Sequence, residues 1–238
     1  MGMLKSAVRE GLKAALPASS PPLLVASMGR SGSTVVYDSL VAGMAAARFG
    51  ERGSRLTGLV RDTAWHLGGA RFHSGRVYKT HDFPYDLSPG ASPRVVFLFG
   101  STSAAARSVL RCETTYGPDW IAEHLEHLSA HGALRDVPVR DVLRFGEQLD
   151  GWLACETVPV LSLRYEDLWR SGAGTVLSRY AGFPVRLPPQ RARESASVDL
   201  GAVGRQLMDT YAALDGRVAA LPAIRANRKA QLLLDTAG

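Results

Sequence analysis

The feature that most constrains the fold is a short apolar run that leads directly into a glycine-containing turn. Residues 23–27 are Leu-Leu-Val-Ala-Ser, and Met28-Gly-Arg-Ser-Gly-Ser-Thr34 follows at once. Uninterrupted apolar runs of this length are typical of strands buried on both faces of a parallel sheet. Residues 35–47 then read as a helix. A buried strand, a glycine-containing loop and a helix form the frame of a phosphate-binding loop.

Further strands and helices alternate along the chain. We predict strands at 76–80, 94–99 and 158–163. The third strand is followed by small residues at 100–106 and a helix to about Cys112, and further helices are predicted at 119–131, 140–154, 166–180 and 201–220. This alternation is typical of βαβ units. The sequence therefore predicts an α/β fold, a three-layer sandwich around a central parallel sheet of about four to five strands.

Length and composition favour one ordinary globular domain. The chain has 238 residues, of which 46% are apolar, and we expect residues 1–238 to form a single domain. Within it, residues 1–20 read as an N-terminal amphipathic helix and a linker. No apolar run approaches the roughly 20 residues of a membrane span, so we expect no integral membrane segment.

Charge and cysteine content narrow the class of partner. The 28 basic and 22 acidic residues give a net charge of +6, which suits an anionic ligand. The basic residues are dispersed and lack interleaved aromatics, so we expect no nucleic-acid partner.

The cysteines are Cys112 and Cys155, and no signal peptide is evident, so we expect a cytoplasmic protein. The sequence leaves the oligomeric state open, with a homodimer as one option.

The loop Gly29–Thr34 has the chemistry of an anion site. Its backbone N–H groups and hydroxyls can donate to an anion, and the Arg30 guanidinium can bind one with two hydrogen bonds. The loop departs from the GxxxxGK[ST] pattern of nucleotide hydrolases, because Ser33 follows Gly32 and Ser27 stands at the first glycine position. The lysine used with ATP and magnesium is therefore missing. A plain strand-to-helix turn is the alternative interpretation.

A lysine and a histidine follow the second strand. Lys79 and His81 are two residues apart, so their side chains point to the same side of an extended chain. Ligands of open α/β sheets bind beyond the carboxyl ends of the strands, where the glycine loop also lies. A neutral imidazole there can accept a proton, and an ammonium group can neutralise developing charge. A capping histidine and a solvated lysine are the alternatives.

Four blocks, in this order and spacing, resemble the sulfotransferases that use 3′-phosphoadenosine-5′-phosphosulfate (PAPS). They are Gly29-Arg-Ser-Gly-Ser-Thr34, Lys79-Thr-His81, the segment from the third strand to Ser108, and Arg164-Tyr-Glu-Asp-Leu168. The resemblance covers roughly residues 20–200. It implies an enzyme that moves a sulfuryl group from PAPS, without a metal, to a hydroxyl or amine of a small-molecule, natural-product or carbohydrate acceptor.

The resemblance also implies roles for individual residues. His81 is expected to be the general base, with Lys79 and Arg30 stabilising charge at the reacting group. The residues expected to bind PAPS are Arg30, Ser31, Gly32, Ser33, Thr34, Ser108 and Tyr165. Residues 48–75 and 112–150 are expected to form a cap on the acceptor side.

One departure from the family concerns the 3′-phosphate of PAPS. The family has an Arg eight positions before the serine, where this chain has Gly100 before Ser108, and residues 228–230 are a weak echo of a C-terminal Arg-Lys-Gly loop. We name Arg191 and Arg193 as candidates to replace the missing cation, with a solvated basic loop as the alternative. If no other arginine binds the 3′-phosphate, the protein uses a cofactor other than PAPS or has lost transferase activity. The competing functions are a P-loop kinase-like phosphotransferase and a degenerate, non-catalytic nucleotide-binding protein.

Three histidines and a tryptophan lie in the segment that follows Ser108. His124, His127 and His131 are spaced i, i+3 and i+7, which places them on one face of the predicted helix. Zinc binding is conceivable for such a set, but an exposed polar face is the interpretation we favour. The tryptophans at 120, 152 and 169 are interpreted as packing residues, with a place in the lining of an acceptor pocket as the alternative for one of them.

Overall fold

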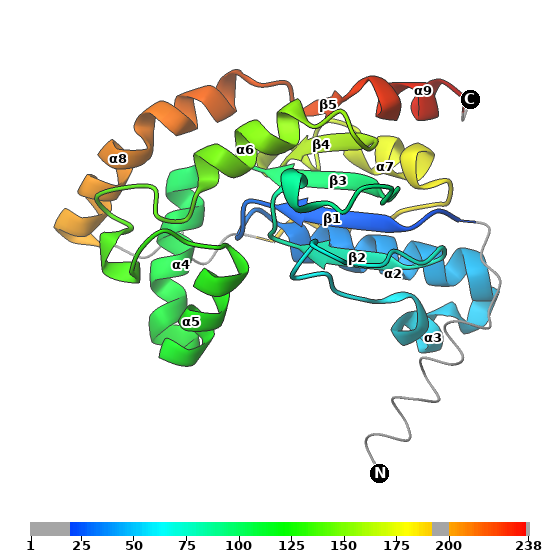
Figure 1. Cartoon of the computed structure of the whole chain (residues 1–238), viewed down its shortest axis with the longest axis horizontal. Helices are drawn as coiled ribbons and strands as arrows, with labels where there is room; N and C mark the ends of the chain where they lie inside the picture. Colours follow the sequence, from blue (N-terminus) through cyan, green and yellow to red (C-terminus); the bar gives the residue numbers. More distant parts are fainter. Residues whose placement is uncertain (1–19, 192–199, 237–238) are drawn as a thin grey trace, which may run out of the picture.

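The structure is a computed structural model that describes residues 20–191 and 200–236. Its centre is a five-stranded sheet in the order β2-β1-β3-β4-β5 (Figure 1). The strands are β1 (Leu23–Ser27), β2 (Val77–Thr80), β3 (Arg94–Phe99), β4 (Val160–Arg164) and β5 (Ile224–Ala226). The first four strands are parallel and β5 is antiparallel to β4. The predicted α/β class is confirmed, whereas β5 was not predicted because its three residues carry no long apolar run.

Eight α-helices in the described ranges surround the sheet. They are α2 (Ser33–Phe49), α3 (Gly53–Val60), α4 (Thr102–Tyr116), α5 (Pro118–His127), α6 (Phe145–Ala154), α7 (Ala173–Ala181), α8 (Gly201–Ala220) and α9 (Arg228–Thr236). Short 3₁₀ turns cover Gly50–Arg52, Pro84–Asp86, Leu134–Asp136 and Tyr165–Asp167. The N-terminal helix predicted within residues 1–20 lies outside the described residues, apart from Ser20.

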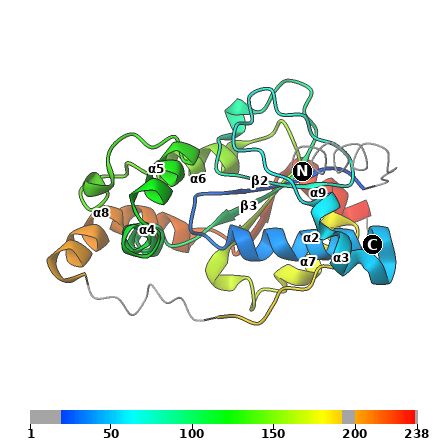
Figure 2. The same cartoon turned by 90° about the horizontal axis from the view of Figure 1, so that it is seen from below.

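Two hydrophobic clusters lie on the two faces of the sheet, because successive strand residues point in opposite directions. Leu24 and Ala26 of β1 pack with α4, α5, α6 and α8 on one face. Leu23 and Val25 pack with α2, α7 and α9 on the other. Figure 2 shows α2 and α7 together on one side of the strands. The predicted three-layer arrangement is therefore confirmed.

Three predicted helices are shorter in the structure than in the sequence analysis. The helix predicted at 140–154 begins only at Phe145, because Arg144 adopts a left-handed conformation with φ of 59°. The helix predicted at 166–180 is divided into a 3₁₀ turn and α7, which starts after left-handed Gly172. The helix predicted at 119–131 ends at His127, so His131 does not belong to it.

The C-terminal Arg228-Lys-Ala segment lies away from the carboxyl ends of the strands. It forms the start of α9, and the Lys229 ammonium donates to the carbonyl of Thr157 at 2.7 Å. Thr157 precedes β4, so this contact lies at the amino end of that strand. The weak echo of the family's C-terminal loop therefore does not serve the predicted site.

The strand order creates one natural ligand crevice. β1 lies between β2 and β3, and the chain leaves β1 in one direction and β3 in the other. Such a switch point opens a crevice beyond the carboxyl ends of the strands. Helices α4, α5 and α8 gather beyond that end of the sheet (Figure 1). In the described ranges, no helix has the length and apolarity needed to cross a membrane.

Helix α8 closes the turn that follows β3. The Asp215 carboxylate of α8 accepts hydrogen bonds from the backbone N–H groups of Thr102 and Ser103 and from the hydroxyls of Ser101, Thr102 and Ser103. A carboxylate at a helix N-terminus is favourable because it pairs with unsatisfied N–H groups and with the helix dipole. The Asp215 carboxylate thus occupies the N-terminal end of α4, where an external anion would otherwise bind.

We predict that replacing Asp215 with Ala lowers the free energy of unfolding by about 2 kcal/mol, because several donors at the start of α4 lose their acceptor. Urea denaturation measures this change. Asp209→Ala, on an exposed position of the same helix, is the matched control and should change stability by less than about 0.5 kcal/mol. Equal effects of the two substitutions would contradict this account of the α4 cap.

Candidate active site

The turn after β1 is built from left-handed residues. Gly29, Arg30 and Gly32 have φ values of 81°, 51° and 79°. Gly32 is the N-cap of α2 and has no side chain with which to cap it. The N-terminal N–H groups of α2 and its dipole therefore favour an anion at this turn. Arg30 is not a glycine, so its left-handed backbone is strained, and such strain is common at functional sites.

Gly32 is required by a close contact as well as by its backbone. A Cβ atom at position 32 would overlap the Tyr165 ring, which lies directly against the turn. This contact joins the end of β1 to the 3₁₀ turn after β4. The Tyr165 ring therefore lies beside the Gly29–Thr34 loop.

The loop opens into a cavity of about 610 Å³ at the switch point. Eight of the predicted site residues line it: Arg30, Gly32, Ser33, Thr34, Lys79, His81, Ser108 and Tyr165. The Ser31 side chain is buried instead, and its hydroxyl donates to the Gly29 carbonyl at 2.9 Å, so it supports the turn. Arg191 lies in a second cavity, and Arg193 lies outside the described residues.

His81 is held in one orientation by its neighbours. Its Nδ1 lies 3.1 Å from the Ser27 carbonyl oxygen and 3.0 Å from the Ser27 hydroxyl. A carbonyl only accepts, so Nδ1 carries the proton in the first of these bonds and Nε2 keeps a lone pair. The backbone carbonyl of His81 accepts a hydrogen bond from the Gln148 amide of α6. The ring is thus oriented as a proton acceptor.

Burial keeps His81 uncharged. The residue is 6% exposed, and desolvation lowers its pKa well below the ordinary value of 6.5, with His124 and Lys79 lowering it further. A buried histidine next to a lysine ammonium group is neutral at pH 7. It can therefore accept a proton from a bound hydroxyl.

Two cations connect the loop to its neighbours. The Lys79 ammonium donates to the Thr34 hydroxyl at 2.9 Å, and burial lowers the pKa of Lys79. The Arg30 Nε donates to the Ser108 hydroxyl at 2.8 Å, which joins the loop to α4. Both positive groups therefore lie at the edge of the same cavity as His81.

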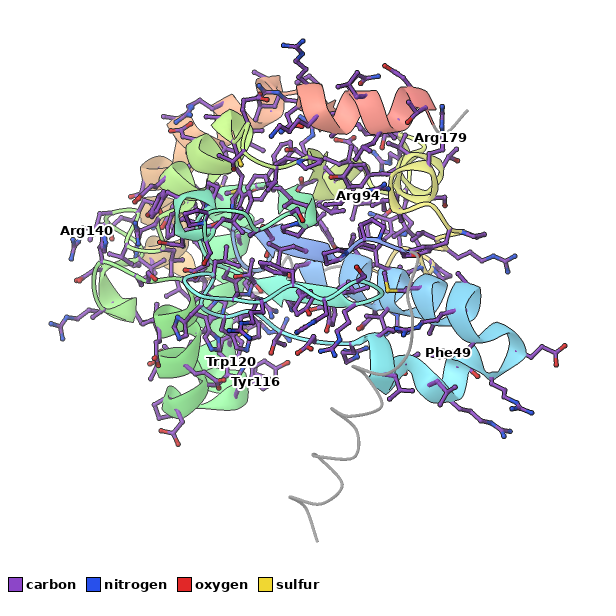
Figure 3. The ribbon with its side chains drawn as sticks, turned by 45° about the vertical axis from the view of Figure 1, so that its right-hand side comes forward. Phe49, Arg94, Tyr116, Trp120, Arg140 and Arg179 are labelled. Atoms are coloured by element: carbon purple, nitrogen blue, oxygen red, sulfur yellow. The ribbon has the colours of Figure 1, made fainter. Side chains whose placement is uncertain are left out.

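One face of α5 forms a wall of the cavity. This helix lies within residues 112–150, which were expected to form a cap, but the sequence analysis gave its residues no role in the site. Trp120, Glu123, His124 and His127 line it, and they follow helical spacing. The Trp120 ring stacks on His124 at 4.7 Å. Figure 3 shows Trp120 beside Tyr116, which lines the same cavity. In the sequence, Trp120, His124 and His127 are spaced i, i+4 and i+7, and this pattern of aromatic rings on one helix face was the available signal.

The interpretation of the α5 histidines as an exposed polar face was wrong. His124 is 7% exposed and His127 is half-buried, while His131 is exposed. The Trp65 ring stacks on His127 and the Trp120 ring on His124, so one face of each imidazole is shielded from water. Within residues 20–191 and 200–236, no group of three or more His, Cys, Asp or Glu side chains is arranged to hold a metal ion.

Gly100 lies against the carboxylate of Glu166. A Cβ atom at position 100 would lie 2.9 Å from Oε2 of Glu166, whose other oxygen accepts from the Ser101 backbone N–H. Glu166 also lines the second cavity, together with Ser101, Ala104, Tyr165, Arg170, Gln190 and Arg191. Two arginines, at positions 170 and 191, therefore lie close to the turn that lacks the family's cation.

The sequence matches no protein-family model, and it matches none of the curated proteins. These comparisons therefore assign no chemistry to the site.

We predict that the buried histidines make stability fall with acidity. Burial lowers the pKa of His124 to about 4. Below pH 6.5 this histidine is therefore protonated in the unfolded chain but stays neutral in the folded chain, so the unfolded state gains stability. Between pH 7.5 and pH 5.5 this residue alone lowers the free energy of unfolding by about 1.3 kcal/mol. Urea denaturation of the native protein and of His124→Phe at both pH values measures the difference. The same loss of stability in both proteins would contradict the assignment.

Proposed function

We propose that this protein is a sulfotransferase that moves a sulfuryl group from PAPS to a hydroxyl or amine of a small-molecule, natural-product or carbohydrate acceptor. The observation that carries the proposal is the meeting of three groups in one cavity: the uncapped α2 turn, the cations Arg30 and Lys79, and the neutral His81. An anion loop alone would serve many ligands. A neutral base beside it favours transfer to a group that loses a proton.

The proposed reaction uses these residues for positioning and charge stabilisation. His81 Nε2 takes the proton of the acceptor as a bond forms between the acceptor atom and sulfur. At the same time the bond between sulfur and the bridging phosphate oxygen breaks, and 3′,5′-adenosine bisphosphate leaves. Arg30, Lys79 and the N–H groups at the start of α2 hold the negative charge that develops on the transferred group and on the leaving oxygen. No metal is required in this proposal.

The donor end of the cavity fits a phosphosulfate, because its donors are N–H groups, hydroxyls of Ser33 and Thr34, and a guanidinium. For the 3′-phosphate we propose Ser108 together with Arg191, which lies near the Gly100 turn. Arg193 is the other arginine that we assign to this role. Tyr165 lines both cavities and is proposed to pack against the nucleotide between them. Because Cys112 and Cys155 are free and buried, we also propose that the enzyme acts in the reducing cytoplasm.

We predict that 3′,5′-adenosine bisphosphate raises the unfolding temperature of the protein by about 5–11 °C at 100 times its dissociation constant. ADP should give a smaller shift, because it lacks the 3′-phosphate. Differential scanning fluorimetry makes the comparison, with ATP and magnesium as a third ligand.

The other outcomes separate the competing functions. A shift with ATP and magnesium, but none with the bisphosphate, would favour the kinase-like phosphotransferase. Binding of the bisphosphate with no transfer to any acceptor would favour the non-catalytic nucleotide-binding protein.

We predict that His81→Ala lowers the transfer rate by at least about 100-fold while changing the affinity for the bisphosphate little, because the base contacts the acceptor proton and not the nucleotide. Transfer from labelled PAPS and isothermal titration measure the two quantities. His131→Ala, an exposed histidine outside the cavity, is the control and should keep full activity. Full activity of the His81 variant would show that the base is another group.

A further inference from the structure

We propose that Trp65 is a positioning residue whose indole face stabilises His81 when that ring takes up the acceptor proton. The inference rests on the proposed function, since it assigns a partner to the proposed base. Trp65 lines the cavity, and its ring stacks on His81 with centroids 5.6 Å apart and planes inclined by 28°. A cation within about 6 Å of the face of a tryptophan is attracted by the negative face of the ring. An imidazolium at His81 lies within that range.

His81 needs such a partner because its other neighbours oppose a positive charge. Lys79 of β2 and His124 and His127 of α5 all act to keep the ring neutral, and burial acts in the same direction. The Ser27 carbonyl of β1 is the group that favours the protonated ring. During transfer the ring must nevertheless carry the acceptor proton. A stacked indole offers attraction to the charged ring without adding a charge that would protonate it beforehand.

The backbone fixes Trp65 relative to His81. The residue before it, Ala64, donates from its N–H to the Lys79 carbonyl at 2.9 Å. Two residues after it, the Leu67 N–H donates to the Asp82 carboxylate at 2.7 Å. The backbone on both sides of Trp65 is therefore hydrogen-bonded to Lys79 and Asp82, the residues that flank Thr80 and His81. A backbone held in this way presents the indole to His81 before the charge appears.

The same indole also stacks on His127, with centroids 4.2 Å apart and planes inclined by 12°. The Nε2 of His127 lies 4.0 Å from the Glu123 carboxylate. These contacts hold the indole against α5 as well as against the base. Trp120 is a natural comparison, because it lines the same cavity but stacks on His124.

The test replaces Trp65, by site-specific incorporation, with tryptophan carrying one, two or three fluorine atoms on the indole. Fluorine withdraws electrons from the ring face and changes its size little, so packing and folding are kept. We expect the pKa of His81, followed by NMR of the labelled imidazole, to fall stepwise with each fluorine. We expect the transfer rate to fall in parallel, by about 2- to 30-fold across the series.

The same series at Trp120 is the control and should change the His81 titration much less, because Trp120 stacks on His124 and not on His81. An unchanged His81 titration in the Trp65 series, or the same change in both series, overturns the inference. If the wild-type protein transfers sulfate to no acceptor but the titration still follows the fluorine number, the proposed function fails and the stabilising role of Trp65 stands. If transfer occurs and neither titration nor rate responds, the function stands and the role of Trp65 is wrong.

Discussion

The pairing of β1 between β2 and β3 is the constraint on which the site depends. Parallel pairing on both sides brings the carboxyl end of β1 next to that of β2, where the Ser27 carbonyl meets the His81 ring. The same pairing opens the crevice between β1 and β3, into which the left-handed turn projects. Without it the Gly29–Thr34 loop would be one more surface turn, and His81 would have no partner to fix its tautomer.

Charge at this end of the sheet is distributed unevenly between two strand-to-helix turns. The turn after β3 is neutralised by the protein itself, since Asp215 fills the start of α4 and Glu166 lies against Gly100. The turn after β1 keeps an uncapped helix start with Arg30 and Lys79 around it. An anionic group entering the crevice is therefore drawn to the β1 turn. This asymmetry makes the turn after β1 more favourable for an anion than the start of α4.

Much of this arrangement was predictable from local sequence. The apolar run at 23–27, the glycine turn and the Lys79–His81 pair indicated parallel strands and an anion site at their ends, because strand burial and side-chain alternation are local properties. Residues 48–75 and 112–150 were predicted to form a cap, but the contacts of Trp65 and of the α5 face were not predicted. They depend on tertiary packing, because Trp65 stacks on His81 and His127, which belong to other parts of the chain. Strand β5 was not predicted because it has only three residues. The helix starts after Arg144 and Gly172 were not predicted because each depends on the left-handed conformation of one residue.

The central claim is that the β1 turn, with Arg30 and Lys79, holds the phosphosulfate end of a nucleotide beside His81. A crystal structure of the protein with 3′,5′-adenosine bisphosphate tests it most directly. The account predicts that the 5′-phosphate accepts hydrogen bonds from the N–H groups at the start of α2 and from Arg30, within reach of Lys79. A nucleotide whose 5′-phosphate lies elsewhere, for example beside Arg170 and Arg191 in the second cavity, would contradict it.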